Sequence, residues 1–402
     1  MKINILGAWL ISGILAFLSL SSCKNDGFAV PLENSTVPPG MITNVNIENR
    51  KGGAIITYAL PDDQDLLYVK ANYVLQNGTK MEAKASYYNN SLTIEGYSDT
   101  LEHNVTLYAV NRSEVASDSV VVKIKPLRSS IWDVFKSLKA TAAFGGVRID
   151  ALNSERSDVA ILIMEKDQYG EWQISPNSIY TSTDTIGYTY RGLDTNGHKF
   201  AITIRDRWLN YTDTLFTDIK PLYETAIPKS QYSGIHLPGD APWNTKTTMD
   251  GMWDGDILNW PKVYQTQAAD LNPAMITINI GSKVKLSRVV IWDYPEYYNG
   301  RTYYYLGNLK DFEIYGWPSS TPPTDASLDN WVLLGHYHAT KPSGLPFGEQ
   351  NDEDYQTAYN GFNWDIDISA PKVQYIRIRS IKNWGGTTYM GIAELQVYGD
   401  PR

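Results

Sequence analysis

Six tyrosines fall within one short segment that joins two stretches of β-forming residues. A strand pattern with Val289 and Ile291 precedes the segment, and one with Phe312 and Ile314 follows it. The tyrosines between them are Tyr294, Tyr297, Tyr298, Tyr303, Tyr304 and Tyr305. A connecting segment is normally polar because it runs over the surface, so an aromatic-rich one either packs onto the core as a lid or offers flat rings to a ligand. We favour the second interpretation, in which the rings bind a ligand.

Polar side chains that can pair with neighbouring hydroxyl groups accompany these rings. They are Asp293, Glu296, Asn299 and Arg301 in the same segment and Asn383 further along the chain. A pyranose has an apolar face of C–H groups and an equator of hydroxyls, so it is recognised by a flat ring together with planar donors and acceptors. These residue types predict a sugar-binding loop. The alternative is that some of the rings fill the mouth of the surrounding β-structure.

The tyrosine segment lies within a longer series of strand patterns, from about residue 223 to the end of the chain. Apolar and polar residues alternate over 276–280 and 376–379, which predicts strands with one buried face, as in a two-sheet jelly roll. The series contains DGMWDGD at 250–256, ITINIG at 276–281, LKDFEIYG at 309–316, VQYIRI at 373–378 and GIAELQVYG at 391–399. It resembles the discoidin, or coagulation-factor type C, domains, which share the galactose-binding-like jelly roll with family 32 carbohydrate-binding modules.

This resemblance implies where a ligand binds. In such domains the ligand rim is formed by the loop after the first Asp-Gly turn, the long loop after the second barrel strand and the loop before the last strand. The matching residues here are 252–264, 293–308 and 382–390. The expected ligand contacts are Trp253, Trp260, Asp293, Tyr294, Glu296, Tyr297, Tyr298, Arg301, Tyr303, Tyr304, Asn383, Trp384 and Tyr389.

The resemblance also implies one structural calcium ion between the Asp-Gly turn and the last strand. Calcium takes about 6–8 oxygen ligands, including carboxylates and backbone carbonyls. The matching carboxylates are Asp250, Asp254, Asp256 and Glu394. The alternative is an Asp-Gly turn that holds no metal.

Residues 41–127 and 128–222 predict two β-sandwiches ahead of this domain. The first range contains short strand patterns at 42–47, 54–58, 67–75, 81–87, 91–94, 104–110 and 119–124, the pattern of an immunoglobulin-like sandwich. The sequence around Pro38-Pro39-Gly40 and Gly53-Ala54-Ile55 resembles fibronectin type III domains. We expect this domain to act as a spacer.

An internal repeat predicts the second sandwich. HNVTLYAVNRSEVASDSVVVKIKPL at 103–127 aligns without a gap on HKFAITIRDRWLNYTDTLFTDIKPL at 198–222. We expect a short helix at 131–135 and strands at 141–148, 159–165, 172–175 and 185–190. The predicted fold class is therefore all-β, with two immunoglobulin/fibronectin III-like sandwiches followed by a galactose-binding-like jelly roll. The second sandwich is also expected to be a spacer.

The amino terminus has the pattern of an export signal. Lys2 precedes an apolar run from residue 3 to 20, and Leu20-Ser21-Ser22-Cys23 resembles a bacterial lipobox. Residues 1–22 would then be a lipoprotein signal peptide, with Cys23 lipidated and 23–40 forming a stalk. Lys24-Asn25-Asp26-Gly27 resembles the signal that sends lipoproteins of Bacteroides-type bacteria to the outer face of the outer membrane. The alternative is a membrane anchor, because about 18 apolar residues can just span a bilayer.

The net charge limits the classes of partner that the chain is expected to bind. The formal net charge is −9, so the chain lacks the basic footprint of a nucleic-acid-binding protein.

The whole layout is similar to surface lipoproteins encoded in polysaccharide-utilisation clusters of Bacteroides-type bacteria. That resemblance implies a non-catalytic cell-surface protein that captures polysaccharide or oligosaccharide for a neighbouring glycan transporter complex.

Two other functions remain open from the sequence. One is an enzyme with its site in the jelly-roll loops, and the other is an adhesin that binds protein. A glycosidase needs two carboxylates that face one bond. The acidic cluster Glu349, Asp352, Glu353 and Asp354 is expected instead to lie in a solvated loop between glycines and prolines. The sequence therefore favours binding without catalysis.

Overall fold

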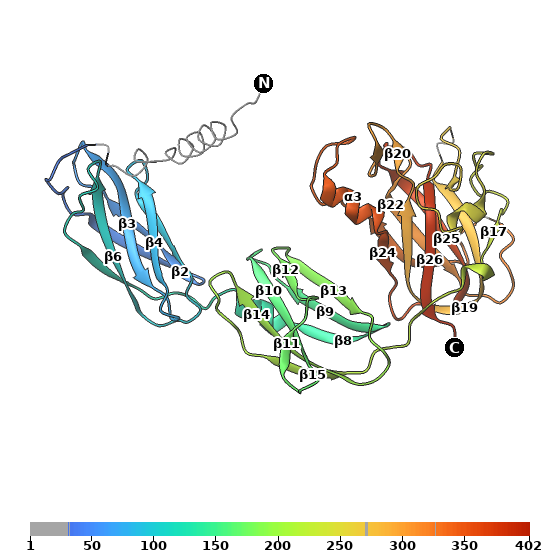
Figure 1. Cartoon of the computed structure of the whole chain (residues 1–402), viewed down its shortest axis with the longest axis horizontal. Coiled ribbons are helices and arrows are strands. Elements are labelled where there is room, and N and C mark those ends of the chain that lie inside the picture. Colours follow the sequence, from blue (N-terminus) through green and yellow to red (C-terminus); the bar gives the residue numbers. More distant parts are fainter. Residues whose placement is uncertain (1–30, 32, 270–271, 326) are drawn as a thin grey trace, which may run out of the picture.

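The computed structural model describes residue 31 and residues 33–269, 272–325 and 327–402. Within this part of the chain, three β-domains follow one another along the longest axis of the molecule (Figure 1). The predicted all-β fold class is confirmed. The predicted signal peptide and the predicted lipidation site Cys23 lie outside the described residues. Among the described residues, we find no helix with the length and apolar character needed to cross a membrane.

The first domain is a sandwich of antiparallel strands. One sheet contains β1 (Thr43–Arg50), β2 (Gly53–Ala59) and β5 (Ser91–Glu95). The other contains β4 (Lys80–Ser86), β3 (Leu66–Val74), β6 (His103–Asn111) and β7 (Val120–Ile124). Alternate residues of these strands, such as Ile56, Val69 and Leu107, point into one shared core. Each strand predicted here is present.

The second domain repeats the sandwich with more divided strands. One sheet contains β8 (Lys139–Ala143), β9 (Gly146–Leu152) and β13 (Thr185–Arg191). The other contains β10 (Val159–Lys166), β11 (Trp172–Ile174), β12 (Ile179–Thr181), β14 (His198–Asp206) and β15 (Leu215–Ile219). Helix α2 (Ile131–Ser137) buries Ile131 and Val134 against the core, as predicted. The single strand predicted over 141–148 is wrong, because the chain turns at Gly145, where φ is +61°.

The third domain is organised around one long strand. β19 (Ala274–Asp293) pairs first with β25 (Val373–Asn383), as at Ile276 opposite Ile378, and later with β26 (Gly391–Asp400), as at Val289 opposite Val397. Register shifts along β19 let it pass from one sheet to the other. The sequence predicts two strands here, at the two ends of what the structure shows as one.

Further elements complete this jelly roll. They are β16 (Thr225–Ala226), η1 (Lys229–Gln231), β17 (Ser233–Ile235), η2 (Met249–Met252), β18 (Tyr264–Gln265), β20 (Glu296–Tyr297), β21 (Arg301–Thr302), β22 (Leu309–Trp317), β23 (Val332–His338), α3 (Asp352–Tyr359) and β24 (Phe362–Asp365). The inner faces of β19, β22, β25 and β26 supply the core, which includes Ile278, Phe312, Ile378 and Leu395. The loops at one end of these strands carry the predicted ligand residues.

Ion pairs bridge the domain junctions. Lys51 of the first domain lies 2.7 Å from Asp133 and 3.0 Å from Glu155 of the second. Arg207 of the second domain lies 2.7 Å from Glu95 of the first. At the other junction, Arg191 lies 2.6 Å from Asp365 of the third domain.

Candidate functional site

The three predicted ligand loops converge at one end of the jelly roll, and we call this surface the rim (residues 252–264, 294–308 and 382–390). The Arg301 guanidinium donates a hydrogen bond to the Leu258 carbonyl, which joins the first loop to the second. The Trp384 amide donates to the Asn308 carbonyl at 3.0 Å, which joins the second loop to the third. Segments far apart in the sequence thus form one continuous surface.

Buried polar groups hold the ends of the tyrosine loop together. Asp293 Oδ1 accepts a hydrogen bond from the Leu309 amide at 3.1 Å, and Asn308 Nδ2 donates to the Tyr294 carbonyl at 2.7 Å. Only 4% of Asp293 is exposed. Burial raises the pKa of this carboxyl to about 8, because a charge there would lose its hydration. The loop therefore starts and ends at fixed positions.

The tip of the loop is a small hairpin. Strands β20 and β21 pair Tyr297 with Arg301, and the connecting residues Asn299 and Gly300 take positive φ values of 52° and 103°. Asparagine and glycine adopt this conformation with little strain, which explains their place in the turn. The hairpin leaves Tyr297 83% exposed, with Tyr298 beside it also on the surface.

Five predicted ligand residues, Asp293, Tyr294, Tyr303, Tyr304 and Asn383, are buried, so the expectation that they contact a ligand on the rim surface is wrong. Tyr303 is 1% exposed and Tyr304 is 2% exposed, while Asp293 is the buried acceptor of the Leu309 amide at the base of the loop. Asn383 donates hydrogen bonds to Thr387 Oγ1 and the Tyr389 carbonyl, both at 2.8 Å, and so shapes its own loop. Burial raises the pKa of Tyr303 and of Tyr304. These residues support the surface from beneath.

The segment that buries Tyr303 and Tyr304 runs from residue 339 to 361, and we call it the covering segment. It contains α3, where Asn351 and Asp354 form a capping box. Tyr355 of α3 lies edge-on to Tyr303 with ring centroids 5.4 Å apart. The predicted acidic loop is therefore partly a helix, in which Asp354 is buried, whereas Glu349, Asp352 and Glu353 are exposed as predicted. The spacing Asn351-x-x-Asp354 was the available signal for this helix.

A buried lysine fixes the rest of the covering segment. Lys341 Nζ donates to the carbonyls of Leu345, Pro346 and Glu349 at 2.7–3.1 Å. The same ammonium lies 5.5 Å from the ring centroid of Trp384 and 5.7 Å from that of Tyr304. Three carbonyls and two rings thus hold one buried cation, which ties the covering segment to the rim.

Exposed rings remain on the rim around the buried ones. Trp260 is 41% exposed and lies 5.9 Å from Tyr294, which is itself largely buried. Tyr298 stacks on Tyr305 with centroids 5.1 Å apart, and Tyr305 stacks on Phe347 of the covering segment at 4.7 Å. We call these three stacked rings the aromatic ladder. Phe347 was not predicted, and an isolated phenylalanine between Pro346 and Gly348 gives no signal of this role.

The remaining predicted contacts are partly buried. Trp253 packs edge-on against Tyr232 at 5.8 Å and contacts the core. Burial raises the pKa of Glu296, and it raises the pKa of Tyr389 to about 12. Arg301 is held by the first loop, and the Trp384 ring lies under Lys310 and Lys341. These side chains are only partly exposed, whereas Tyr297 is 83% exposed.

Two of the predicted calcium ligands, Glu394 and Asp256, have other polar partners in the structure. Glu394 is buried, and its carboxylate accepts hydrogen bonds from Lys229 Nζ and the Gly255 amide, both at 2.6 Å. Asp256 caps its own turn by accepting from Leu258 and Asn259, and the Asn259 side-chain amide contributes most to holding its pKa at about 2. Within the described residues, no three His, Cys, Asp or Glu side chains gather as metal ligands. The Gly255 amide brings the Asp254-Gly255-Asp256 turn against Glu394, where the Lys229 ammonium also pairs with the carboxylate.

Family models match three consecutive parts of the chain. Residues 39–126 and 127–230 match DUF4959 and DUF5126, and residues 253–399 match DUF5000. Each family is described as a domain of unknown function. No curated protein matches the chain.

Solved structures with similar folds include three of different kinds. SusE-like protein BT2857 has 26% sequence identity over 67% of this chain and 98% of its own, with a TM-score of 0.43. The family 32 carbohydrate-binding module of Streptococcus pneumoniae EndoD has 16% identity over 44% and 96%, with a TM-score of 0.26. A two-domain fibronectin type III segment of chicken tenascin has 11% identity over 45% and 99%, with a TM-score of 0.22.

Proposed function

We propose that this protein is a non-catalytic glycan-binding lipoprotein of the cell surface, which contacts carbohydrate through the exposed rings of the rim. The observation that carries the proposal is the group of exposed aromatic side chains Trp260, Tyr297 and Tyr298 on a surface built from distant loops. Flat exposed rings suit the apolar face of a pyranose. The loops that present them are already fixed by buried hydrogen bonds, so little ordering accompanies binding.

The carboxylates near the rim support binding without hydrolysis. A glycosidase needs one carboxyl as acid and a second, ionised carboxylate facing the same bond. Asp293 is buried against the Leu309 amide, and Glu394 is paired with Lys229. Asp254 and Asp256 accept hydrogen bonds within their own turn, and Glu296 is half-buried. We infer that these carboxyl groups stabilise the fold of the loops and do not take part in catalysis.

The cellular setting belongs to the same proposal. The lipobox-like sequence ending at Cys23 would anchor the chain in the outer membrane through lipid, with the three domains outside. The rim lies on the last domain, which is the farthest along the chain from Cys23. A tethered binding surface of this kind would raise the local concentration of polysaccharide for a neighbouring transporter complex.

A polysaccharide panel tests the proposal. The purified chain without its signal peptide is run through native gels that contain single polysaccharides, and the same mixtures are assayed for released reducing ends. We expect at least one polysaccharide to retard migration while no reducing ends appear. Release of reducing ends would replace the proposal with an enzyme. Retardation by none of the polysaccharides, with capture only of protein, would replace it with an adhesin.

A further inference from the structure

A row of three side chains crosses the outer face of one sheet in the second domain. In the register of β10 with its neighbours, Ala160 lies directly opposite Tyr180 of β12 on one side and Arg205 of β14 on the other. Directly opposed residues of neighbouring strands point to the same face of a sheet. A small side chain thus separates two large ones, and adjacent strands are about 4.8 Å apart. The result is a groove with an alanine floor and two tall walls.

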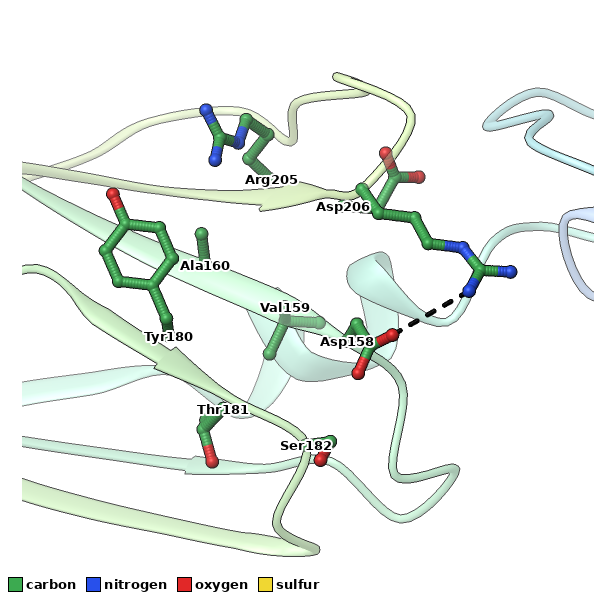
Figure 2. Close-up of a pocket in the computed structure, with 9 residues that line it drawn as sticks. Asp158, Val159, Ala160, Tyr180, Thr181, Ser182, Arg205 and Asp206 are labelled. Atoms are coloured by element: carbon green, nitrogen blue, oxygen red, sulfur yellow. Dashed lines mark ion pairs between the residues drawn. The ribbon is translucent and has the colours of Figure 1, made fainter. Parts of the chain in front are cut away.

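The groove forms part of a cleft of about 380 Å³ (Figure 2). Tyr180 is 66% exposed, and in Figure 2 its ring rises from β12 on the same side of the sheet as the Arg205 side chain. Ala160 between them is 5% exposed. The cleft therefore offers one face of an aromatic ring on one wall and a guanidinium on the other.

Arg205 is the charged group of this cleft that lacks a partner. Its Nε is buried and makes no hydrogen bond, and among the described residues its side chain forms no ion pair. The other charged side chains are engaged. Arg207 bridges Asp158 at 3.8 Å and Glu95 at 2.7 Å, while Asp206 accepts hydrogen bonds from the Trp208 and Asn210 amides, both at 2.9 Å.

An unpaired guanidinium is unusual in a chain with a net charge of −9. Burying even part of a charged group costs free energy unless a partner compensates, and the planar fork of arginine matches a carboxylate with two parallel hydrogen bonds. The facing tyrosine ring suits the C–H face of a pyranose. A sugar residue that carries a carboxylate can pair with the guanidinium and pack its ring on the tyrosine at the same time.

We propose that this cleft binds a uronic-acid residue, with its carboxylate on Arg205 and its ring on Tyr180. The inference rests on the proposed glycan-binding function and adds a second, anionic-sugar site, which lies in the second domain rather than on the rim. The second domain would then hold acidic polysaccharide as well as separate the other two domains.

Saturation-transfer NMR on the full chain without its signal peptide tests the proposal. The probes are sodium glucuronate and sodium galacturonate, with methyl glucoside and methyl galactoside as uncharged controls. We expect saturation transfer to the uronates that weakens in 0.5 M salt, since added ions screen the exposed part of the contact. Arg205→Gln should weaken uronate affinity by about tenfold or more, because a hydrogen bond to a charged group contributes about 1.5–3 kcal/mol. Tyr180→Ala should weaken it less.

Matched variants separate this site from the rim. Arg156→Gln removes a different arginine of the same domain, which is exposed and pairs with Asp184 at 3.0 Å, and should leave uronate binding unchanged. The triple rim variant Trp260→Ala, Tyr297→Ala and Tyr298→Ala should also leave it unchanged. Equal uronate binding by Arg205→Gln and wild type would overturn the inference, as would an absence of transfer to either uronate. Loss of uronate binding in the rim variant alone would overturn it while supporting the rim as the glycan site.

Discussion

Replacing Asp293 with asparagine should stabilise the third domain at neutral pH. Asp293 lies at the base of the tyrosine loop, where its Oδ1 accepts the Leu309 amide and the rest of the carboxyl is buried. Burial raises its pKa from 3.8 to about 8, so the folded protein keeps this carboxyl protonated at pH 7 while the unfolded chain releases the proton. Asparagine has the same shape, keeps an oxygen for the Leu309 amide and does not titrate.

The magnitude follows from proton linkage. Because the folded-state pKa is raised, the contribution of Asp293 to stability is fully present below about pH 4 and is lost as the pH rises through the folded pKa near 8. Each pH unit in this window costs about 1.4 kcal/mol, so the folded state loses about 4 kcal/mol between pH 4 and pH 7. The asparagine variant avoids this loss. For a domain of this size, about 4 kcal/mol corresponds to a rise in Tm on the order of 10 °C at pH 7.

Scanning calorimetry of the full chain at pH 4, 5.5, 7 and 8.5 measures the effect. We expect the Tm of the third domain to be nearly equal in wild type and Asp293→Asn at pH 4. As the pH rises further, the Tm of the variant should exceed that of wild type by an amount that grows up to about pH 8 and stays constant above it. A difference in Tm that does not change with pH, or a variant that unfolds below wild type at pH 7, would show that Asp293 is not a buried neutral acid.

Two further predictions concern groups that hold the rim in place. Lys229→Met leaves the buried Glu394 carboxylate without its cation and should cost about 3 kcal/mol of stability, whereas calcium chloride or EDTA should leave the wild-type Tm unchanged. A calcium-dependent rise in wild-type Tm would instead favour the metal site. Lys341→Met removes the donor to three backbone carbonyls of the covering segment, so amides at 341–361 should exchange with deuterium at least tenfold faster while those of the first domain stay unchanged. Unaltered exchange at 341–361 would mean that Lys341 does not hold this segment.

Local patterns in the sequence predict much of the fold. The strands of the first domain follow from alternating residues and turn signals, and the internal repeat predicts that the second domain has similar strands. The turn at Gly145 could have been predicted, because the pair Gly145-Gly146 in the middle of residues 141–148 is a turn signal, and Gly145 takes the left-handed conformation there. Helix α3 was missed because its acidic first turn resembles a solvated loop when its capping box is overlooked.

The candidate site depends on contacts between distant residues, which local patterns do not contain. The sequence identifies the three loops of the rim, yet Tyr303 and Tyr304 are buried because a segment about 50 residues further along folds over them. Glu394 matched a calcium ligand in the resembling domains, but Lys229, 165 residues earlier, takes the place beside it. The Tyr180–Ala160–Arg205 row likewise exists only through strand register.

Isothermal titration calorimetry of the rim variants tests the central claim most directly. The titrant is the polysaccharide that most strongly retards the wild-type chain, and the proteins are wild type, the triple variant Trp260→Ala, Tyr297→Ala and Tyr298→Ala, and the control Tyr169→Ala. Tyr169 is 81% exposed, close to the 83% of Tyr297, but lies in the second domain. We predict that Tyr169→Ala binds with the wild-type Kd and that the triple variant binds at least about tenfold more weakly, since each lost ring contact contributes about 0.5–1.5 kcal/mol. A triple variant that binds as tightly as wild type would contradict the account.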